Sequence, residues 1–268
     1  MLISDQIAVV TGAGSGLGRA TAQMLLQAGA RVAAIDLQAP APAEPHADRF
    51  LALSGDVSDE ADMEAAFAAI RSRWEPARIL VNCAGILGPA RVFRIDKATG
   101  RAEARPLDTF RRVIDVNLVG TFNTLRLFAH ALAQAEPCTA DGERGVIINT
   151  ASIAAHEALS AQAAYGASKA GVASKTLPLA RELARYGIRV STLAPGTFET
   201  GIYEIVPSHT RRTLIDDVPF PKRPGQPAEF AHMVRALIEN PMMNGCVVRI
   251  DGGVRMREPV AASTEPAR

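Results

Sequence analysis

The chain has 268 residues, of which 48% are hydrophobic and 21% charged, and its formal net charge is +1. This length allows one large domain with a well-buried core, while the near-neutral charge argues against general electrostatic binding to nucleic acid or to an anionic membrane. The sequence has no signal-peptide pattern, no apolar run of about 18 residues that would cross a membrane, and no metal-ligand or disulfide spacing among its three cysteines, so we expect a reducing compartment such as the bacterial cytoplasm.

Strand-like and helix-like segments alternate along the whole chain. The predicted buried strands are Ile7–Val10, Arg31–Ile35, Phe50–Leu53, Ile79–Val81, Val146–Asn149, Arg189–Leu193 and Cys246–Ile250. The predicted amphipathic helices are Gly18–Ala28, Glu60–Arg73, Leu107–Ala133, Gln162–Arg185 and Pro227–Ile238. This alternation predicts an α/β fold, namely a single doubly wound domain over residues 1–257 in which helices cover both faces of a parallel seven-stranded sheet, the Rossmann arrangement.

Three segments interrupt this alternation. Residues 38–46 contain too many prolines for regular structure, so we expect a loop. Residues 92–106 have the pattern of an inserted hairpin with its turn near Thr99 and Gly100. The polar tail, residues 258–268, is expected to be mobile.

The first predicted strand runs directly into the sequence TGAGSGLG (Thr11–Gly18) and then into a helix. Glycines permit positive φ angles and a close approach of the backbone, and the N–H groups at a helix N-terminus favour an anion. A strand, a glycine turn and a helix in this order predict a cradle for the pyrophosphate of a dinucleotide. The candidate cofactor-binding residues in this segment are Gly12, Ser15, Gly16, Leu17 and Gly18.

Asp36 ends the second predicted strand, 18 residues after Gly18. A carboxylate at this place can accept hydrogen bonds from the adenosine ribose hydroxyls and would repel a 2′-phosphate. The following residues, 37–43, carry no positive charge that could hold such a phosphate. We therefore expect NAD rather than NADP.

A serine, a tyrosine and a lysine follow the fifth predicted strand. Ser152 lies just after the strand's carboxyl end, and Tyr165 comes 13 residues later, four residues before Lys169. The i, i+4 spacing puts the last two on one helix face. Oxidation of an alcohol needs a base, and a tyrosine with an ordinary pKa of about 10 is a poor one unless a neighbouring ammonium favours the phenolate. We expect Lys169 to lower the pKa of Tyr165 in this way, and Ser152 to stabilise charge on the substrate oxygen.

The motifs together resemble those of the short-chain dehydrogenase/reductase superfamily. Its matching segments are TGAGSGLG, Asp56-Val57, Asn82-Cys83-Ala84-Gly85, Asn117 in DVNLVG, Ser152 with Tyr165 and Lys169, and Pro195-Gly196 followed by Thr200. This resemblance implies that Asp56, Val57, Asn82, Ala84, Gly85, Tyr165, Lys169, Pro195, Gly196 and Thr200 contact the cofactor and that Asn117 supports a proton-relay water. Asn117 could equally be a buried structural residue. Cys83 departs from the family's usual asparagine, and we interpret it as a packed small side chain rather than a reactive thiol.

Longer segments resemble one group of that superfamily, the type II 3-hydroxyacyl-CoA dehydrogenases. The similarity spans roughly residues 7–257 and is strongest in VPFPKRPGQPAEFAHMVRALIENPMMNGCVVRIDGGVRM, while the loop after the second strand, the hairpin and residues 197–203 depart from it. It implies NAD-dependent, reversible oxidation of short or branched 3-hydroxyacyl-CoA substrates by a homotetramer, with residues 197–225 as a substrate lid. An alternative is a dehydrogenase for a steroid or another small secondary alcohol, and an alternative of another class is an NAD-binding scaffold with little turnover.

Basic residues cluster in the hairpin and in the predicted lid. They are Lys97, Arg101, Arg105, Arg211 and Arg212. Charge-assisted hydrogen bonds from such residues would hold the phosphates of CoA beside the substrate mouth. Solvated surface charge is the alternative interpretation of the same residues.

Overall fold

The structure, a computed structural model, describes residues 1–41, 46–201, 211 and 214–257. Its seven-stranded sheet has the order β3-β2-β1-β4-β7-β8-β9, and every neighbouring pair is parallel. The strands are β1 (Ile7–Thr11), β2 (Arg31–Asp36), β3 (Phe50–Ser54), β4 (Ile79–Asn82), β7 (Gly145–Thr150), β8 (Ile188–Pro195) and β9 (Val247–Ile250). The predicted parallel α/β fold is confirmed.

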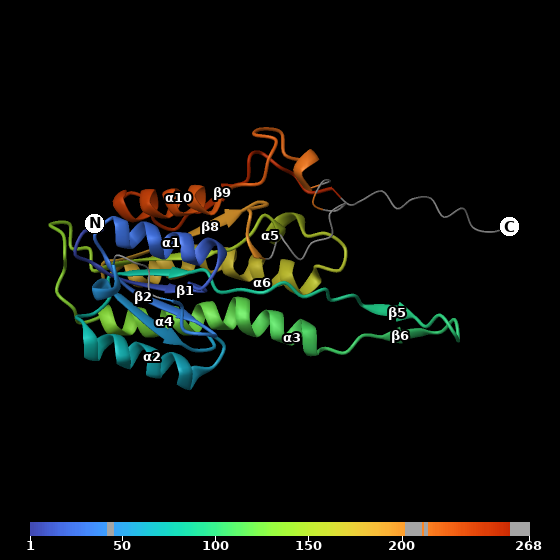
Figure 1. Cartoon of the computed structure of the whole chain (residues 1–268), viewed down its shortest axis with the longest axis horizontal. Coiled ribbons are helices and arrows are strands. Elements are labelled where there is room, and N and C mark those ends of the chain that lie inside the picture. The colour runs from blue at the N-terminus through green and yellow to red at the C-terminus, as the bar shows by residue number, and fades with distance from the viewer. Residues whose placement is uncertain (42–45, 202–210, 212–213, 258–268) are drawn as a thin grey trace.

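Helices cover both faces of this sheet (Figure 1). The helices of the main layers are α1 (Gly16–Gln27), α2 (Glu60–Arg73), α3 (Asp108–Ile114), α4 (Gly120–Leu132), α6 (Ala163–Ser174), α7 (Thr176–Ala184) and α10 (Pro227–Glu239). One apolar cluster joins α1 and α10 to one face, and a second joins α2, α4 and α7 to the other. Because successive side chains of a strand point to opposite faces, Ala8 and Val10 pack in the first cluster and Val9 in the second.

Two of the predicted helices are less regular than the sequence suggested. The segment expected to form one helix over 107–133 contains a π-helical turn, η2 (Asp115–Val119), between α3 and α4. The segment 162–185 is divided into α6 and α7 at Lys175. Pro178 has no N–H to donate to the carbonyl of Ser174, which interrupts the helical hydrogen-bond ladder at this point. A short helix, α5 (Ala154–Glu157), was not predicted at all.

Residues 92–106 form an antiparallel hairpin that extends away from the sheet and its helices (Figure 1). Its strands are β5 (Phe93–Ile95) and β6 (Ala102–Ala104). In the turn, the Asp96 carboxylate accepts hydrogen bonds from the backbone N–H groups of Ala98 and Thr99, and Gly100 has a φ of 69°. Parts of the predicted loop 38–46 and lid 197–225, and all of the predicted tail, lie outside the described residues.

Across the described ranges, no helix is both long enough and apolar enough to span a membrane.

We expect Phe128→Ala to lower the free energy of unfolding by about 3–5 kcal/mol, because Phe128 on α4 is fully buried against the sheet and truncation leaves a cavity. Urea denaturation at a fixed protein concentration measures this. Phe122→Ala is the matched control, since this phenylalanine of the same helix is 48% exposed, and it should cost less than about 1 kcal/mol. Equal losses in the two variants would contradict the assignment of the α4 core face.

Candidate active site

The chain leaves β1 and β4, which are neighbours in the sheet, toward opposite faces. In parallel α/β sheets a crevice opens at the carboxyl ends of two such strands. A cavity of about 220 Å³ and a second of about 230 Å³ lie at this edge. They adjoin, because both are lined by Leu17, Cys83, Gly85 and Thr200. The result is one long cleft with two compartments.

The loop from β1 to α1 forms the inner wall of the first compartment. Gly12 has a φ of 66°, and a Cβ atom there would lie 2.7 Å from the backbone nitrogen of Ala84. A Cβ atom at Gly18 would collide with the carbonyl oxygen of Gly12. The Ser15 side chain does not cap α1, and the first turn of this helix carries no acidic residue. Its N–H groups are therefore available to an anionic ligand, so the residues present fit a dinucleotide pyrophosphate.

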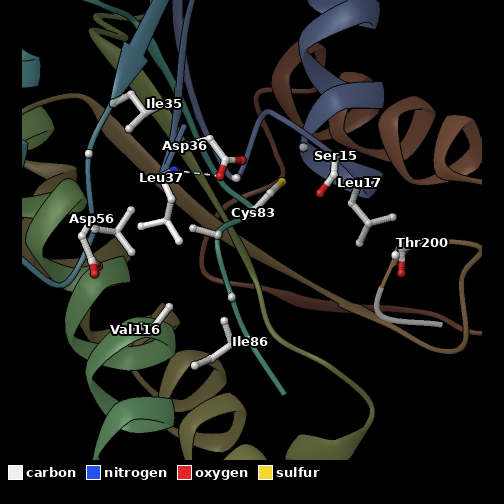
Figure 2. Close-up of a pocket in the computed structure, with 18 of the residues that line it drawn as sticks. Ser15, Leu17, Ile35, Asp36, Leu37, Asp56, Cys83, Ile86, Val116 and Thr200 are labelled. Atoms are coloured by element: carbon white, nitrogen blue, oxygen red, sulfur yellow. Dashed lines mark hydrogen bonds between the residues drawn. The ribbon is translucent and has the colours of Figure 1, made fainter. Parts of the chain in front are cut away.

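Asp36 stands on the other side of this compartment, facing the glycine loop (Figure 2). One carboxylate oxygen accepts a hydrogen bond from the backbone N–H of Gly14 at 2.8 Å, and the other accepts one from Leu37, also at 2.8 Å. Two backbone donors thus hold the carboxylate in place at the cavity wall. Each oxygen keeps a further lone pair for a ligand hydroxyl.

Asp56 and Val57 line the same compartment, and there the structure adds a residue that the sequence did not suggest. Arg112 of α3 also lines it and donates to the Asp56 carboxylate at 2.9 Å. Although burial raises the pKa of Asp56, hydrogen bonds from Ser58 and Arg112 hold it below its ordinary value. No spacing could have found Arg112, because 56 residues separate it from Asp56.

Ser152, Tyr165 and Lys169 meet in the second compartment. Ser152 follows β7, whereas the other two lie one turn apart on α6. A side-chain hydrogen bond joins Tyr165 to Ser152, and the Lys169 ammonium lies 5.8 Å from the centroid of the Tyr165 ring. Lys169 also donates to the carbonyl oxygen of Thr150 at 2.8 Å, which anchors it at the cavity wall.

Burial changes the pKa of both α6 groups. It raises the pKa of Tyr165 above its ordinary value, and the hydrogen bond with Ser152 acts in the opposite direction without cancelling it. The net shift of the Tyr165 pKa is therefore upward, and our expectation that Lys169 lowers this pKa stays a prediction. Burial also lowers the pKa of Lys169 to about 8, so its ammonium form still predominates at pH 7.

Asn82 and Asn117 were expected at the cofactor and at a relay water, and neither lines the two cavities. The Asn82 amide is fully engaged below the cleft with Thr124 at 2.7 Å and Asn149 at 3.0 Å. Asn117, in the π-helical turn, accepts from the backbone N–H of Ile86 and donates to its carbonyl oxygen. Both side chains thus support the loop after β4 from beneath, and only residues after Asn82 reach the cleft.

The remaining predicted residues lie at the cleft. Ala84 lines the first compartment, Pro195 and Gly196 line the second, and Thr200 lies where they adjoin. Burial raises the pKa of the Cys83 thiol to about 11, in keeping with a packed rather than a reactive side chain.

The basic residues of the hairpin are exposed and line neither cavity. Arg94 pairs with Glu103 at 2.7 Å across the hairpin, whereas the described part of the chain offers Lys97 and Arg101 no ion-pair partner. Arg212 lies outside the described residues.

Comparison with known proteins identifies this constellation. Residues 6–210 match the sequence family described as short chain dehydrogenase. The chain belongs to the short-chain dehydrogenase family. It is 45% identical to 3-hydroxyacyl-CoA dehydrogenase type-2 of Homo sapiens, over 95% of this chain and 97% of that protein, and 43% identical to the Drosophila melanogaster protein of that name, over 95% and 99%. The crystal structure of 3-hydroxyacyl-CoA dehydrogenase type-2 from Mycobacterium avium superposes with a TM-score of 0.80 at 37% identity, covering 95% of this chain and 97% of that one.

This short-chain dehydrogenase is therefore an oxidoreductase that uses a nicotinamide cofactor and a small-molecule substrate. Membership of this family favours an enzyme over the NAD-binding scaffold with little turnover that we considered from the sequence. The first compartment, with its glycine loop and Asp36, suits a nucleotide, and the second holds the titratable groups beside an apolar wall.

Proposed function

We propose that this short-chain dehydrogenase interconverts 3-hydroxyacyl-CoA and 3-oxoacyl-CoA, with NAD as the cofactor. The observation that carries the proposal is the second compartment, where Tyr165 and Ser152 line a cavity together with several large apolar side chains. Its apolar lining residues are Leu87, Ile153, Leu159, Phe198, Leu214 and Met256. Such a lining suits an acyl chain, and the names of the 43–45% identical relatives support a thioester substrate.

In the proposed reaction NAD supplies the hydride acceptor when bound. The Tyr165 hydroxyl, as phenolate, takes the proton of the substrate hydroxyl, and in the reverse direction it returns that proton to the carbonyl oxygen. Ser152, already hydrogen-bonded to Tyr165, donates to the same oxygen and stabilises the charge that develops on it. Lys169 contributes a positive charge 5.8 Å from the Tyr165 ring, held in place by the Thr150 carbonyl.

The roles of the cofactor-contacting residues follow from the shape of the first compartment. We assign the pyrophosphate to the loop Gly12–Gly18 and the N-terminus of α1, the adenosine ribose to Asp36, and the adenine to the wall formed by Asp56 and Val57. Asp36 supports NAD rather than NADP, because its fixed carboxylate would lie against a 2′-phosphate.

We also propose a homotetramer, a single catalytic domain over residues 1–257, a substrate lid over 197–225 and a reducing compartment such as the bacterial cytoplasm. Val119, about half exposed in the π-helical turn that packs against α6, is an apolar side chain that a neighbouring subunit would cover.

We expect Tyr165→Phe to reduce kcat by at least about 10²-fold, because the variant keeps the ring but has no proton to exchange. NADH binding, followed by fluorescence titration, should change less than twofold. Tyr186→Phe is the matched control, since Tyr186 lies outside both cavities. Wild-type turnover in Tyr165→Phe would remove this tyrosine from the mechanism.

We expect Asp36→Ala to lower the ratio of kcat/KM for NAD over NADP by about tenfold or more, because it removes a charged acceptor for the ribose and the repulsion of a 2′-phosphate. Steady-state kinetics with the two cofactors measure the ratio. Asp48→Ala removes an exposed carboxylate outside the cavities and should leave it unchanged. An unaltered ratio in Asp36→Ala would contradict the proposed cofactor selection.

The substrate class is tested by following NADH oxidation with acetoacetyl-CoA, free acetoacetate, simple 2-alkanones and a 3-oxosteroid. We expect kcat/KM to be at least about tenfold higher for the thioester than for any of the free ketones. A steroid or alkanone as good as acetoacetyl-CoA would replace the acyl-CoA proposal by the alternative of another small secondary alcohol.

A second experiment tests whether the basic residues of the hairpin bind the phosphates of CoA. The double variant Lys97→Ala/Arg101→Ala should raise the KM for acetoacetyl-CoA several-fold while leaving that for acetoacetate unchanged, because only the CoA ester carries phosphates. Arg71→Ala/Arg73→Ala, on the exposed end of α2, removes the same charge elsewhere and is the control. An unchanged KM in the hairpin variant would indicate that its cations are solvated surface charge.

A further inference from the structure

The segment that follows β9 returns across the mouth of the second compartment. We call residues 251–257 the C-terminal strap. Gly252 and Gly253 have φ angles of 65° and 84°, in the left-handed region that favours glycine, and so they reverse the chain direction. Beyond this turn, Met256 joins the lining of the cavity that holds Ser152 and Tyr165. The sequence analysis gave Met256 no role.

An ion-pair network holds the strap at Val254 and at Met256. Arg249, at the end of β9, pairs with Glu157, the last residue of α5, at 2.7 Å. The same Arg249 donates to the backbone carbonyl of Val254 at 3.0 Å, while Glu157 accepts from the backbone N–H of Met256 at 2.9 Å. The exposed fractions of the two side chains are 25% and 18%, so solvent screens this pair less than a surface pair. The backbone N–H of Met256 is thus bonded to α5, and the Val254 carbonyl two residues earlier is bonded to Arg249 of β9.

The Met256 side chain packs against a small apolar cluster formed by Ile153, Val218 and Val254. Ile153 directly follows Ser152 and lines the cavity as well. One wall of the substrate cavity therefore consists of Ile153, which is adjacent to Ser152, and of Met256 from the C-terminal part of the chain. The methionine side chain is unbranched and flexible. The space that it occupies limits how far an apolar ligand can extend into the cavity.

We infer that Met256, held by the Glu157–Arg249 pair, determines the length and branching of the acyl chain that the enzyme accepts. The inference rests on the proposed function, because it names the part of the substrate that this wall meets. Met256 is a specificity-determining residue that contacts the substrate, and Glu157 is a positioning residue that acts through it. Removing or enlarging one buried apolar side chain in a substrate pocket changes discrimination by about tenfold per methylene group.

The test uses the intact chain and 3-oxoacyl-CoA substrates of four, six and eight carbons. Met256→Ala should raise kcat/KM for the eight-carbon substrate relative to acetoacetyl-CoA by about tenfold, and Met256→Trp should lower the same ratio by about tenfold. NADH binding should stay within about threefold in both, because Met256 does not line the first compartment, and this shows that the variants are folded. Met242→Ala is the control, because Met242 is 86% exposed and lines neither cavity.

Glu157→Ala tests the strap itself. It should shift the chain-length ratio in the same direction as Met256→Ala, because Met256 is no longer held, and Glu157→Gln should restore part of the wild-type ratio by offering an acceptor to the Met256 N–H. A merely structural role of Glu157 would change thermal stability without changing this ratio, and that result would overturn the positioning role.

The acyl-CoA function and the role of Met256 can be disproved separately. If wild-type enzyme shows no preference for CoA thioesters, the proposed function is wrong, and the same variants are then compared on 2-alkanones of increasing length. If wild-type enzyme reduces acyl-CoA substrates but both Met256 variants keep its chain-length profile, the inference is wrong and the proposed function stands.

Discussion

At the carboxyl ends of β1 and β4 the backbone of Gly12 lies directly against that of Ala84, and the whole cleft is arranged around this approach. Any side chain at Gly12 would meet the loop after β4 at 2.7 Å and push the two loops apart. Beneath the contact, Thr11 donates toward Asn82, and Asn82 is held in turn by Thr124 and Asn149. A buried polar network therefore fixes the distance between two loops that must leave a narrow slot above them.

Hydrogen bonds oppose the effect of burial to different extents in the two compartments. In the first, hydrogen bonds from Ser58 and Arg112 hold the pKa of Asp56 below its ordinary value although burial raises it. In the second, apolar walls penalise charge, so burial raises the pKa of Tyr165 and lowers that of Lys169. In the apolar surroundings of Tyr165, its direct hydrogen-bond partners can stabilise the phenolate. The hydrogen bond with Ser152 acts in this direction and lowers the pKa of Tyr165.

Sequence-distant segments complete the walls of the cleft. Arg112 reaches Asp56 from α3, and the C-terminal strap reaches α5 through the Arg249–Glu157 pair. The residues at the strand ends thus form the floor of the cleft. The added segments contribute side chains that shape its opening, a division common to open α/β sheets.

The sequence by itself determined the order of elements and motifs along the chain. It showed seven apolar runs, a glycine turn after the first, an acidic residue after the second, and the spacing of Ser152, Tyr165 and Lys169. These signals are local, since a strand, a tight turn or an i, i+4 pair is encoded within a few residues. The parallel α/β fold and the family followed from them and are confirmed.

Only the tertiary structure decided which of these residues face the cleft. It placed the Asn82 and Asn117 side chains outside the two cavities, and it buried Tyr165, which raises the pKa of this tyrosine. It divided the predicted helix 162–185 at Lys175, and it brought Met256 to a cavity whose reacting serine lies more than a hundred residues earlier. These contacts and pKa shifts depend on tertiary packing and on the desolvation of each group. Neither can be predicted from the spacing of residues along the chain.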